Sequence, residues 1–303
     1  MPVRAYTIVV QPRPIERLRR ATPTAKITRR IADVSTSREN APLVELVAEL
    51  RWESAIAIKP PVIGGAGPAF VATNTSALDG FFMRFGGAAS NLSYTESERL
   101  IPVGFPILAH QAVYRFKHNE SGETRSLYQI GSGLFSANAI PPYKSWTSFE
   151  PVVRNGVEAL LKSRDPSEAS QPFTAVSLRY IDAFGPQHTE GRDVMRFLTE
   201  VLGIGITVPP ALSRHLRADT PIKPVLQLQI PMAEGMVMSV AIGEGVANGQ
   251  QALMMDTSVA TTLPVPANLE VVMGLFKRAH DTISESFTQL VKPIDHVMPV
   301  KAE

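Results

Sequence analysis

The 303-residue chain contains no cysteine. This absence excludes disulfide bonds, zinc sites with thiolate ligands and a cysteine nucleophile. None of the six histidines lies four residues from another, the spacing that places two imidazoles on one face of a helix. We therefore expect no metal site.

The short sequence signatures of common catalytic sites are also missing. The chain lacks GxSxG, SxxK, HExxH, GxGxxG and GxxxxGK[ST]. Ser132 stands between two glycines, but in a predicted hairpin turn rather than a strand-to-helix elbow. His280 and Asp281 are adjacent on a predicted helix, where successive side chains point about 100° apart, so they do not form a base with its orienting acid. We expect no cofactor and favour a non-catalytic protein.

Long apolar runs and a strong net charge are absent too. No run of 18 apolar residues occurs, so no membrane-spanning helix is expected. Residues 1–10 lack the basic region and apolar core of a signal peptide, and we expect a cytoplasmic protein. The net charge of +2 gives no general attraction to nucleic acid.

The charge is nevertheless concentrated at one end. Residues 1–38 contain nine Lys and Arg against two acidic residues, a net +7, which leaves the rest of the chain at −5. We treat residues 1–40 as a basic arm, with three interpretations: a loosely docked tail, a targeting segment, or a contact with a partner or a nucleic-acid backbone. The nucleic-acid contact would use Arg13, Arg17, Arg19, Arg20, Arg29 and Arg30.

Residues 42–52 (PLVELVAELRW) alternate between apolar and polar positions. A period of two predicts a half-buried strand. Glu45, Glu49 and Arg51 fall on its polar face, where cross-strand ion pairs are the expected role.

The pattern of elements predicts an α+β fold made of two pseudo-repeated units, residues 41–165 and 172–295, on either side of a polar linker at 165–172. Each unit gives a strand, a short helix, an antiparallel meander and a closing helix, so that a curved sheet packs on a long helix. Residues 76–85 are the short helix of the first unit, and residues 96–106 are predicted as a loop. The closing helices are expected at 148–162, capped by Ser148, and from Asn268 to about residue 290.

The second unit contains methionines that could line an apolar pocket between sheet and closing helix. Met254 and Met255 are the main candidates, with Phe184 beside them. Core filling is the alternative role of these side chains. Asp182 and Asp256 would form an acidic pair if their strands were neighbours, although carboxylates near strand ends are commonly turn or cap formers.

Residues 127–153 combine a hairpin, an aromatic corner and the start of a helix. The motifs QxGxxxFSxN and YxxW at 129–146, PLVE…LRW at 42–52 and LRYI[ND] at 178–182 resemble those of a sporadically distributed, uncharacterised family of bacteria and archaea. The resemblance covers about residues 40–292. This chain departs from it by Asp182, where asparagine is expected, and by the basic arm. The resemblance implies no established activity, and sporadic distribution is typical of accessory genes such as defence or toxin–antitoxin components.

These observations favour a binding protein that presents a concave sheet face or a groove between its halves to a protein partner. A small-molecule binding protein or enzyme with an apolar or nucleotide-like ligand is the first alternative, and nucleic-acid binding through the arm is the second. Unpaired sheet edges also allow a homodimer. The candidate surface residues are Gln129, Asn138, Tyr143, Trp146, Arg179, Asp182, Met254 and Met255.

Overall fold

The computed structural model describes residues 38–54, 75–118, 125–141, 145–217 and 220–300, which belong to one compact unit. The strands are β1 (Leu43–Trp52), β2 (Glu96–Arg99), β3 (Ala112–Lys117), β4 (Arg125–Gly131), β5 (Leu134–Ile140), β6 (Phe173–Phe184), β7 (Leu226–Met232), β8 (Met236–Ala247) and β9 (Gln250–Thr261). The helices are α1 (Thr75–Ser90), α2 (Trp146–Ser163), α3 (Pro186–Thr189), α4 (Val194–Glu200), α5 (Pro210–Ser213) and α6 (Leu269–Leu290), with short 3-10 turns η1 (Ala233–Gly235) and η2 (Lys292–Ile294). The fold is α+β with an antiparallel sheet, as predicted.

All nine strands form one sheet in the order β2-β3-β4-β5-β1-β6-β9-β8-β7. Every pair of neighbours is antiparallel. β1 and β6 lie side by side at the centre, and each half of the chain extends outward from there. The two predicted units therefore share a continuous sheet.

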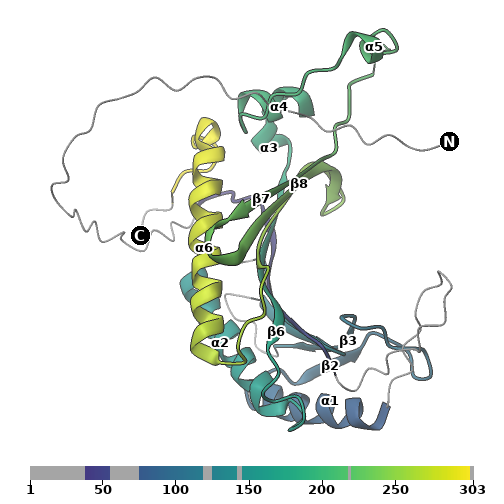
Figure 1. Ribbon diagram of the computed structural model, residues 1–303. Helices are drawn as coiled ribbons and strands as arrows, with labels where there is room; N and C mark the ends of the chain where they lie inside the picture. The colour runs from purple at the N-terminus through teal and green to yellow at the C-terminus, as the bar shows by residue number, and fades with distance from the viewer. Residues whose placement is uncertain (1–37, 55–74, 119–124, 142–144, 218–219, 301–303) are drawn as a thin grey trace, which may run out of the picture. The chain divides into compact units, whose positions relative to one another are not determined.

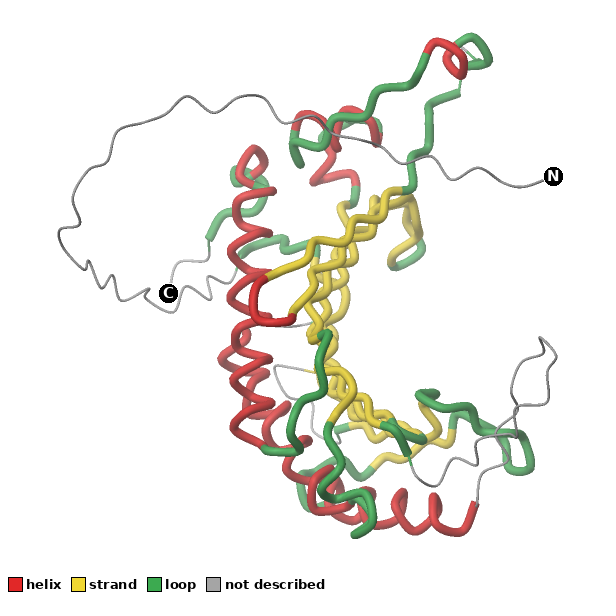
Figure 2. Tube along the Cα trace, viewed as in Figure 1, coloured by secondary structure: helices red, strands yellow, loops and turns green. Residues whose placement is uncertain are grey.

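The sheet is strongly curved, and α2 and α6 run along its convex face (Figure 1, Figure 2). α1 packs against α2 and β3 on the same side. The apolar side chains of the strands point to these helices, and the largest of them, including Trp52, Tyr128 and Phe135, are almost completely buried. Burial of this apolar layer is the main stabilising term of the fold. No described helix covers the concave face.

The helix α2 begins earlier than its pattern predicts. Ser148 is the predicted N-cap, but Ser145 is the cap: its backbone is extended, and its hydroxyl accepts a hydrogen bond from the backbone N–H of Ser148. Ser148 is already helical and donates its own hydroxyl to the Ser145 carbonyl at 2.8 Å. The earlier start places Trp146 in the first turn, where it is buried.

α6 follows its prediction closely. Asn268 is the N-cap, and its side-chain oxygen accepts from the backbone N–H groups of Glu270 and Val271 at 3.0 and 3.1 Å. One side of the helix is buried and packs chiefly on β6 and β9. The cap and the apolar stripe together define this helix from local sequence.

The predicted linker at 165–172 is a packed turn. Glu168 is 3% exposed and accepts a hydrogen bond from the indole Nε1 of Trp52 at 3.0 Å. The guanidinium carbon of Arg164 lies 5.2 and 5.1 Å from the ring centroids of Trp52 and Phe173, and burial lowers the pKa of this guanidinium. These contacts join the end of the first half to the central strands.

Two further elements differ from the prediction. Residues 96–106 are predicted as a loop, but Glu96–Arg99 form the edge strand β2. An edge strand needs no apolar face, so its charged sequence does not reveal it. The helix predicted to end at residue 85 continues to Ser90, because Ala89 adds a further buried contact.

Candidate functional site

The uncovered concave face of the sheet is the candidate functional site. Every second residue of each strand points to this face, and the register aligns these residues in rows across the strands. The first row contains Glu96, Lys117, Leu127, Asn138, Val47, Arg179, Ser258, Ser239 and Gln229. The second contains Glu98, Arg115, Gln129, Ser136, Glu49, Ser177, Ala260, Val237 and Pro231.

A third row lies on the other side of the first. It contains Arg125, Ile140, Glu45, Ile181, Asp256, Ala241 and Gln227. We call the three rows together the concave band. Polar side chains dominate it from β2 to β9, whereas β3, β4, β5, β1, β6 and β9 are mainly apolar on their convex face.

Arg179 and Asp256 form an ion pair across β6 and β9 near the centre of this band. Arg179 Nε donates to Asp256 Oδ1 at 2.7 Å, and its Nη2 donates to Oδ2. Hydrogen bonding to Asp256 raises the pKa of the Arg179 guanidinium. The two side chains remain 49% and 30% exposed, so the pair is accessible to a partner and contributes at most about 1 kcal/mol to stability.

The side chain of Asn138 links two other residues on the same face. Its Nδ2 donates to Glu45 Oε1 at 2.7 Å, and its Oδ1 accepts from Ser136 Oγ at 2.8 Å. Asn138 is only 5% exposed, although no described helix covers this face. Gln129 lies one strand further out, and its side-chain oxygen can accept from Arg115 Nε at 3.1 Å.

The outer strands of the band carry alternating charges. Lys117 Nζ lies 2.8 Å from Glu96 Oε1, and hydrogen bonding to Glu96 raises the pKa of this lysine. Arg115 Nη1 lies 3.3 Å from Glu98 Oε2. The band therefore holds carboxylates and cations in nearly equal number.

Trp146 lies on the opposite, convex side. Its ring is stacked on the imidazole of His280 with centroids 4.9 Å apart and planes 10° apart. Tyr180 Oη and His280 Nδ1 are 2.7 Å apart. The indole Nε1 of Trp146 is buried without a hydrogen-bond partner among the described residues. His280 therefore belongs to this cluster, while Asp281 points elsewhere and pairs with Lys277 at 3.2 Å.

Asp182 also lies on the convex side and is 4% exposed. Burial, and secondarily the charge of Asp256, raises the pKa of its carboxyl to about 7. β6 and β9 are neighbours, but Asp182 and Asp256 point to opposite faces of the sheet. The two carboxylates therefore do not converge on one reacting atom.

A pocket of about 210 Å³ lies between the α3–α4 segment and the ends of β6, β8 and β9. Phe184, Val194, Phe197 and Leu253 line it together with Arg192. Phe184 lines this pocket, but the pocket differs from the predicted one, because no residue of the closing helix α6 is among its lining. Met254 lies on the concave face and Met255 is buried on the convex face, and neither lines this pocket.

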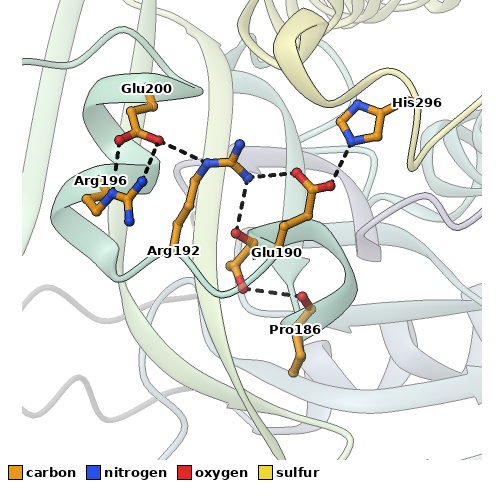
Figure 3. A network of polar contacts seen from close by, with 7 residues as sticks. Pro186, Glu190, Arg192, Arg196, Glu200 and His296 are labelled. Carbon is orange, nitrogen blue, oxygen red and sulfur yellow. Dashed lines mark hydrogen bonds and ion pairs between the residues drawn. The ribbon is translucent and has the colours of Figure 1, made fainter.

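Figure 3 shows the polar network that holds Arg192. Its Nη1 lies 2.7 Å from Glu190 Oε2, and its Nε lies 3.1 Å from Glu200 Oε2. Glu190 also accepts from His296 Nε2 at 2.7 Å, and Glu200 from Arg196 Nε at 2.9 Å. Hydrogen bonds from Arg192 and His296 lower the pKa of Glu190. Because two carboxylates neutralise Arg192, the pocket offers little attraction for an anion.

The candidate surface residues are therefore divided between the two faces of the sheet. Gln129, Asn138, Arg179 and Met254 share the concave face. Trp146, Asp182 and Met255 lie between sheet and helices. Tyr143 and the six arginines of the basic arm lie outside the described residues.

Ser136, Ser177 and Ser258 complete the centre of the concave band but are not among the predicted surface residues. The signal was present as small polar residues at alternate positions of otherwise apolar strands. Over the described ranges, no group of three or more His, Asp or Glu is placed to hold a metal ion. None of the helices described is long and apolar enough to cross a membrane.

Comparison with known proteins adds little. No family model and no curated protein matches the chain. One solved structure, the crystal structure of the di-domain ARO/CYC BexL from the BE-7585A biosynthetic pathway, aligns over 74% of this chain and 95% of its own at 10% identity. Its TM-score of 0.17 is too low to establish a shared fold.

Proposed function

We propose that this chain is a non-catalytic binding protein whose concave sheet face receives a protein partner. The observation that carries the proposal is the concave band: polar side chains dominate it from β2 to β9, on a face that no described helix covers. An uncovered sheet face is solvated in the free protein. A partner can form hydrogen bonds and ion pairs with the polar side chains along this face.

The charges of the band favour a polypeptide over a nucleic acid. Its carboxylates are Glu45, Glu49, Glu96, Glu98 and Asp256, and its cations are Arg115, Lys117, Arg125 and Arg179, with Arg51 at its border. Phosphate groups would meet as many carboxylates as cations. A protein surface that bears both signs can pair with both.

A bulky cation at the centre of the band tests the proposal. Ser177 lies on β6 within the band, and Ser286 lies on α6, on the other side of the sheet. Both are partly exposed, so Ser177→Arg and Ser286→Arg are matched changes of the same chemistry on opposite faces. Each immobilised variant is incubated with an extract of the source cells, and the retained polypeptides are identified by mass spectrometry.

We expect one polypeptide to be retained by the wild type and by Ser286→Arg, and to be lost with Ser177→Arg. Purified, that polypeptide should bind the wild type in calorimetry with an affinity at least tenfold higher than for Ser177→Arg. If all three immobilised proteins retained the same polypeptides equally, the concave band would not be the binding surface. Circular dichroism of each variant verifies that the fold is kept.

Two features of the sequence analysis fit this proposal. The mirrored strand order about β1 and β6 supports the predicted internal duplication, because it gives the two halves equivalent places in the sheet. The resemblance implies no established activity, but the sporadic distribution of that family is typical of accessory genes such as defence or toxin–antitoxin components, and a role as a binding component of such a system is part of the proposal.

The pocket at α3 and α4 supports a second candidate function, binding of a small apolar molecule. Its lining is largely apolar, and its charged residues are already paired. Ala252→Trp would fill the pocket. Ligands from a panel of small apolar compounds should raise the melting temperature of the wild type but not that of this variant. No stabilisation by any compound would count against the pocket.

The basic arm supports a third candidate, nucleic-acid contact. Its charge of +7 predicts binding that weakens steeply with salt. Replacing Arg13, Arg17, Arg19, Arg20, Arg29 and Arg30 by serine should abolish that binding. Retention of full affinity by this variant would exclude the arm.

A further inference from the structure

The two edges of the sheet differ sharply in length and charge. At one edge, β2 has four residues, Glu-Ser-Glu-Arg, of which three are charged. At the other edge, β7 has seven residues, Leu-Gln-Leu-Gln-Ile-Pro-Met, and none is charged. Charged side chains and short length are the usual protection of an edge strand against pairing with another chain. β2 has this protection and β7 lacks the charges.

The side chains of β7 are exposed where their neighbours are buried. Leu228 and Ile230 are 41% and 46% exposed, whereas Val240 and Met238, opposite them on β8, are 8% and 7% exposed. The reason is that α6 packs chiefly on β6 and β9 and does not extend over the edge strand β7. Val225, directly before β7, is 85% exposed. Apolar area thus continues beyond the helix layer to the unpaired edge.

We propose that β7 pairs antiparallel with β7 of a second copy of this chain. With a two-fold axis perpendicular to the sheet, the concave faces of the two copies lie on one side of the joined sheet and their convex faces on the other. Glutamines then meet glutamines on the concave side, and Leu228 and Ile230 meet apolar partners on the convex side. Since the strand has no charge, the symmetric contact brings no like charges together.

Pro231 limits the extent of this pairing. It lacks a backbone N–H and stands near the end of β7 that leads to η1. The paired segment is therefore Leu226–Ile230, and Pro231 sets its boundary. A strand of the same sequence in a protein without a partner would expose an apolar edge that promotes uncontrolled association.

The first test is the mass of the full chain in solution by light scattering after gel filtration. We expect the wild type to have twice the mass of one chain. Leu228→Lys combined with Ile230→Lys places like charges opposite each other in the dimer, and we expect the mass to fall to that of one chain. Because both side chains are already exposed, the circular dichroism spectrum should stay unchanged. Ser97→Lys on β2 is the control and should remain dimeric.

The second test uses the absence of cysteine in the natural sequence. Leu228→Cys and Gln229→Cys, made separately, place a single thiol near the two-fold axis. Mild oxidation should link at least one of them into a disulfide dimer, since opposed residues of paired strands come within reach of a disulfide. Ser97→Cys should not cross-link.

A monomeric wild type would overturn the proposal, and would point to another segment or another protein at this edge. A dimer whose mass the lysine pair leaves unchanged would also overturn it, because the contact would then lie elsewhere. If Ser97→Cys cross-linked as efficiently as the β7 variants, the proposal would also be overturned, because the disulfide would not report pairing at β7. This inference is independent of the partner proposed for the concave band.

Discussion

Asp182 is a buried residue whose ionised side chain destabilises the folded state. Its carboxyl is buried on the convex side, and the charge of Asp256 opposes its ionisation further. Burial raises its pKa to about 7 from the ordinary value of 3.8. The folded state therefore holds a proton that the unfolded chain releases between about pH 4 and pH 7. Stability falls as the pH rises through this window.

We expect Asp182→Asn to remove this loss. At about 1.4 kcal/mol per pKa unit, the ionised carboxylate costs up to about 4 kcal/mol at pH 8. Urea denaturation at pH 5 and pH 8 should show the variant gaining stability over the wild type at pH 8 and far less at pH 5. Asp79→Asn, at an exposed position of α1, serves as the control. An equal effect of Asp182→Asn at both pH values would contradict the raised pKa.

At the scale of elements, α2 is held close to the sheet by a glycine. A Cβ added to Gly156 would lie 2.6 Å from Tyr128 Cε1 and 2.7 Å from Phe135 Cζ, closer than real contacts allow. A Cβ added to Gly274, on the exposed side of α6, would meet nothing within 4 Å. The two glycines thus stand in long helices but in opposite environments.

Because of these environments, we expect a Gly→Ala substitution to change the free energy of unfolding in opposite directions at the two positions. Gly156→Ala should lower the free energy of unfolding by about 1–3 kcal/mol, because steric overlap outweighs the gain in helix propensity. Gly274→Ala should raise it by about 0.5–1 kcal/mol through propensity alone. Chemical denaturation measures both. If Gly156→Ala were stabilising, the close approach of α2 to β4 and β5 would be wrong.

The cap of α6 gives a second prediction at this scale. Asn268→Ala removes the acceptor for two backbone N–H groups and should cost about 1 kcal/mol. Asn268→Asp keeps an acceptor and should cost little. Thermal melting of the two variants separates the loss of the cap from any other effect of the position.

For the whole molecule, the continuous sheet makes the two halves depend on each other. β1 pairs with β5 of its own half and with β6 of the other half, so neither half has a complete sheet alone. We expect residues 38–300 to unfold in one transition.

A destabilising substitution in the second half should therefore also lower the denaturant concentration at which the first half unfolds. Met255→Ala empties a buried site on β9 and should cost about 2–5 kcal/mol. Trp52 and Trp146 both belong to the first half, but Trp146 stacks on His280 of α6, so Trp146→Phe is introduced to leave Trp52 as the reporter. The fluorescence of Trp52 and the far-UV circular dichroism should shift together to lower denaturant concentration. A tryptophan transition that stays in place while circular dichroism shifts would show two independent units.

Local sequence determined most of the elements. The alternation of residues 42–52 predicted β1 and its polar face, and Asn268 with its apolar stripe predicted α6, because side-chain period and capping depend only on neighbouring residues. β2 escaped prediction because its charged sequence has no buried face to reveal a period.

Tertiary structure alone decided which residues meet. The order β5-β1-β6-β9 brings Arg179 to Asp256 and Asn138 to Glu45, contacts that depend on long-range strand pairing and not on sequence spacing. It also divided the candidate surface residues, since Trp146 and Asp182 face the helices while Asn138 and Arg179 face the open side. Alternation showed that each strand has two faces, but only the packing of α2 and α6 determined which face was covered.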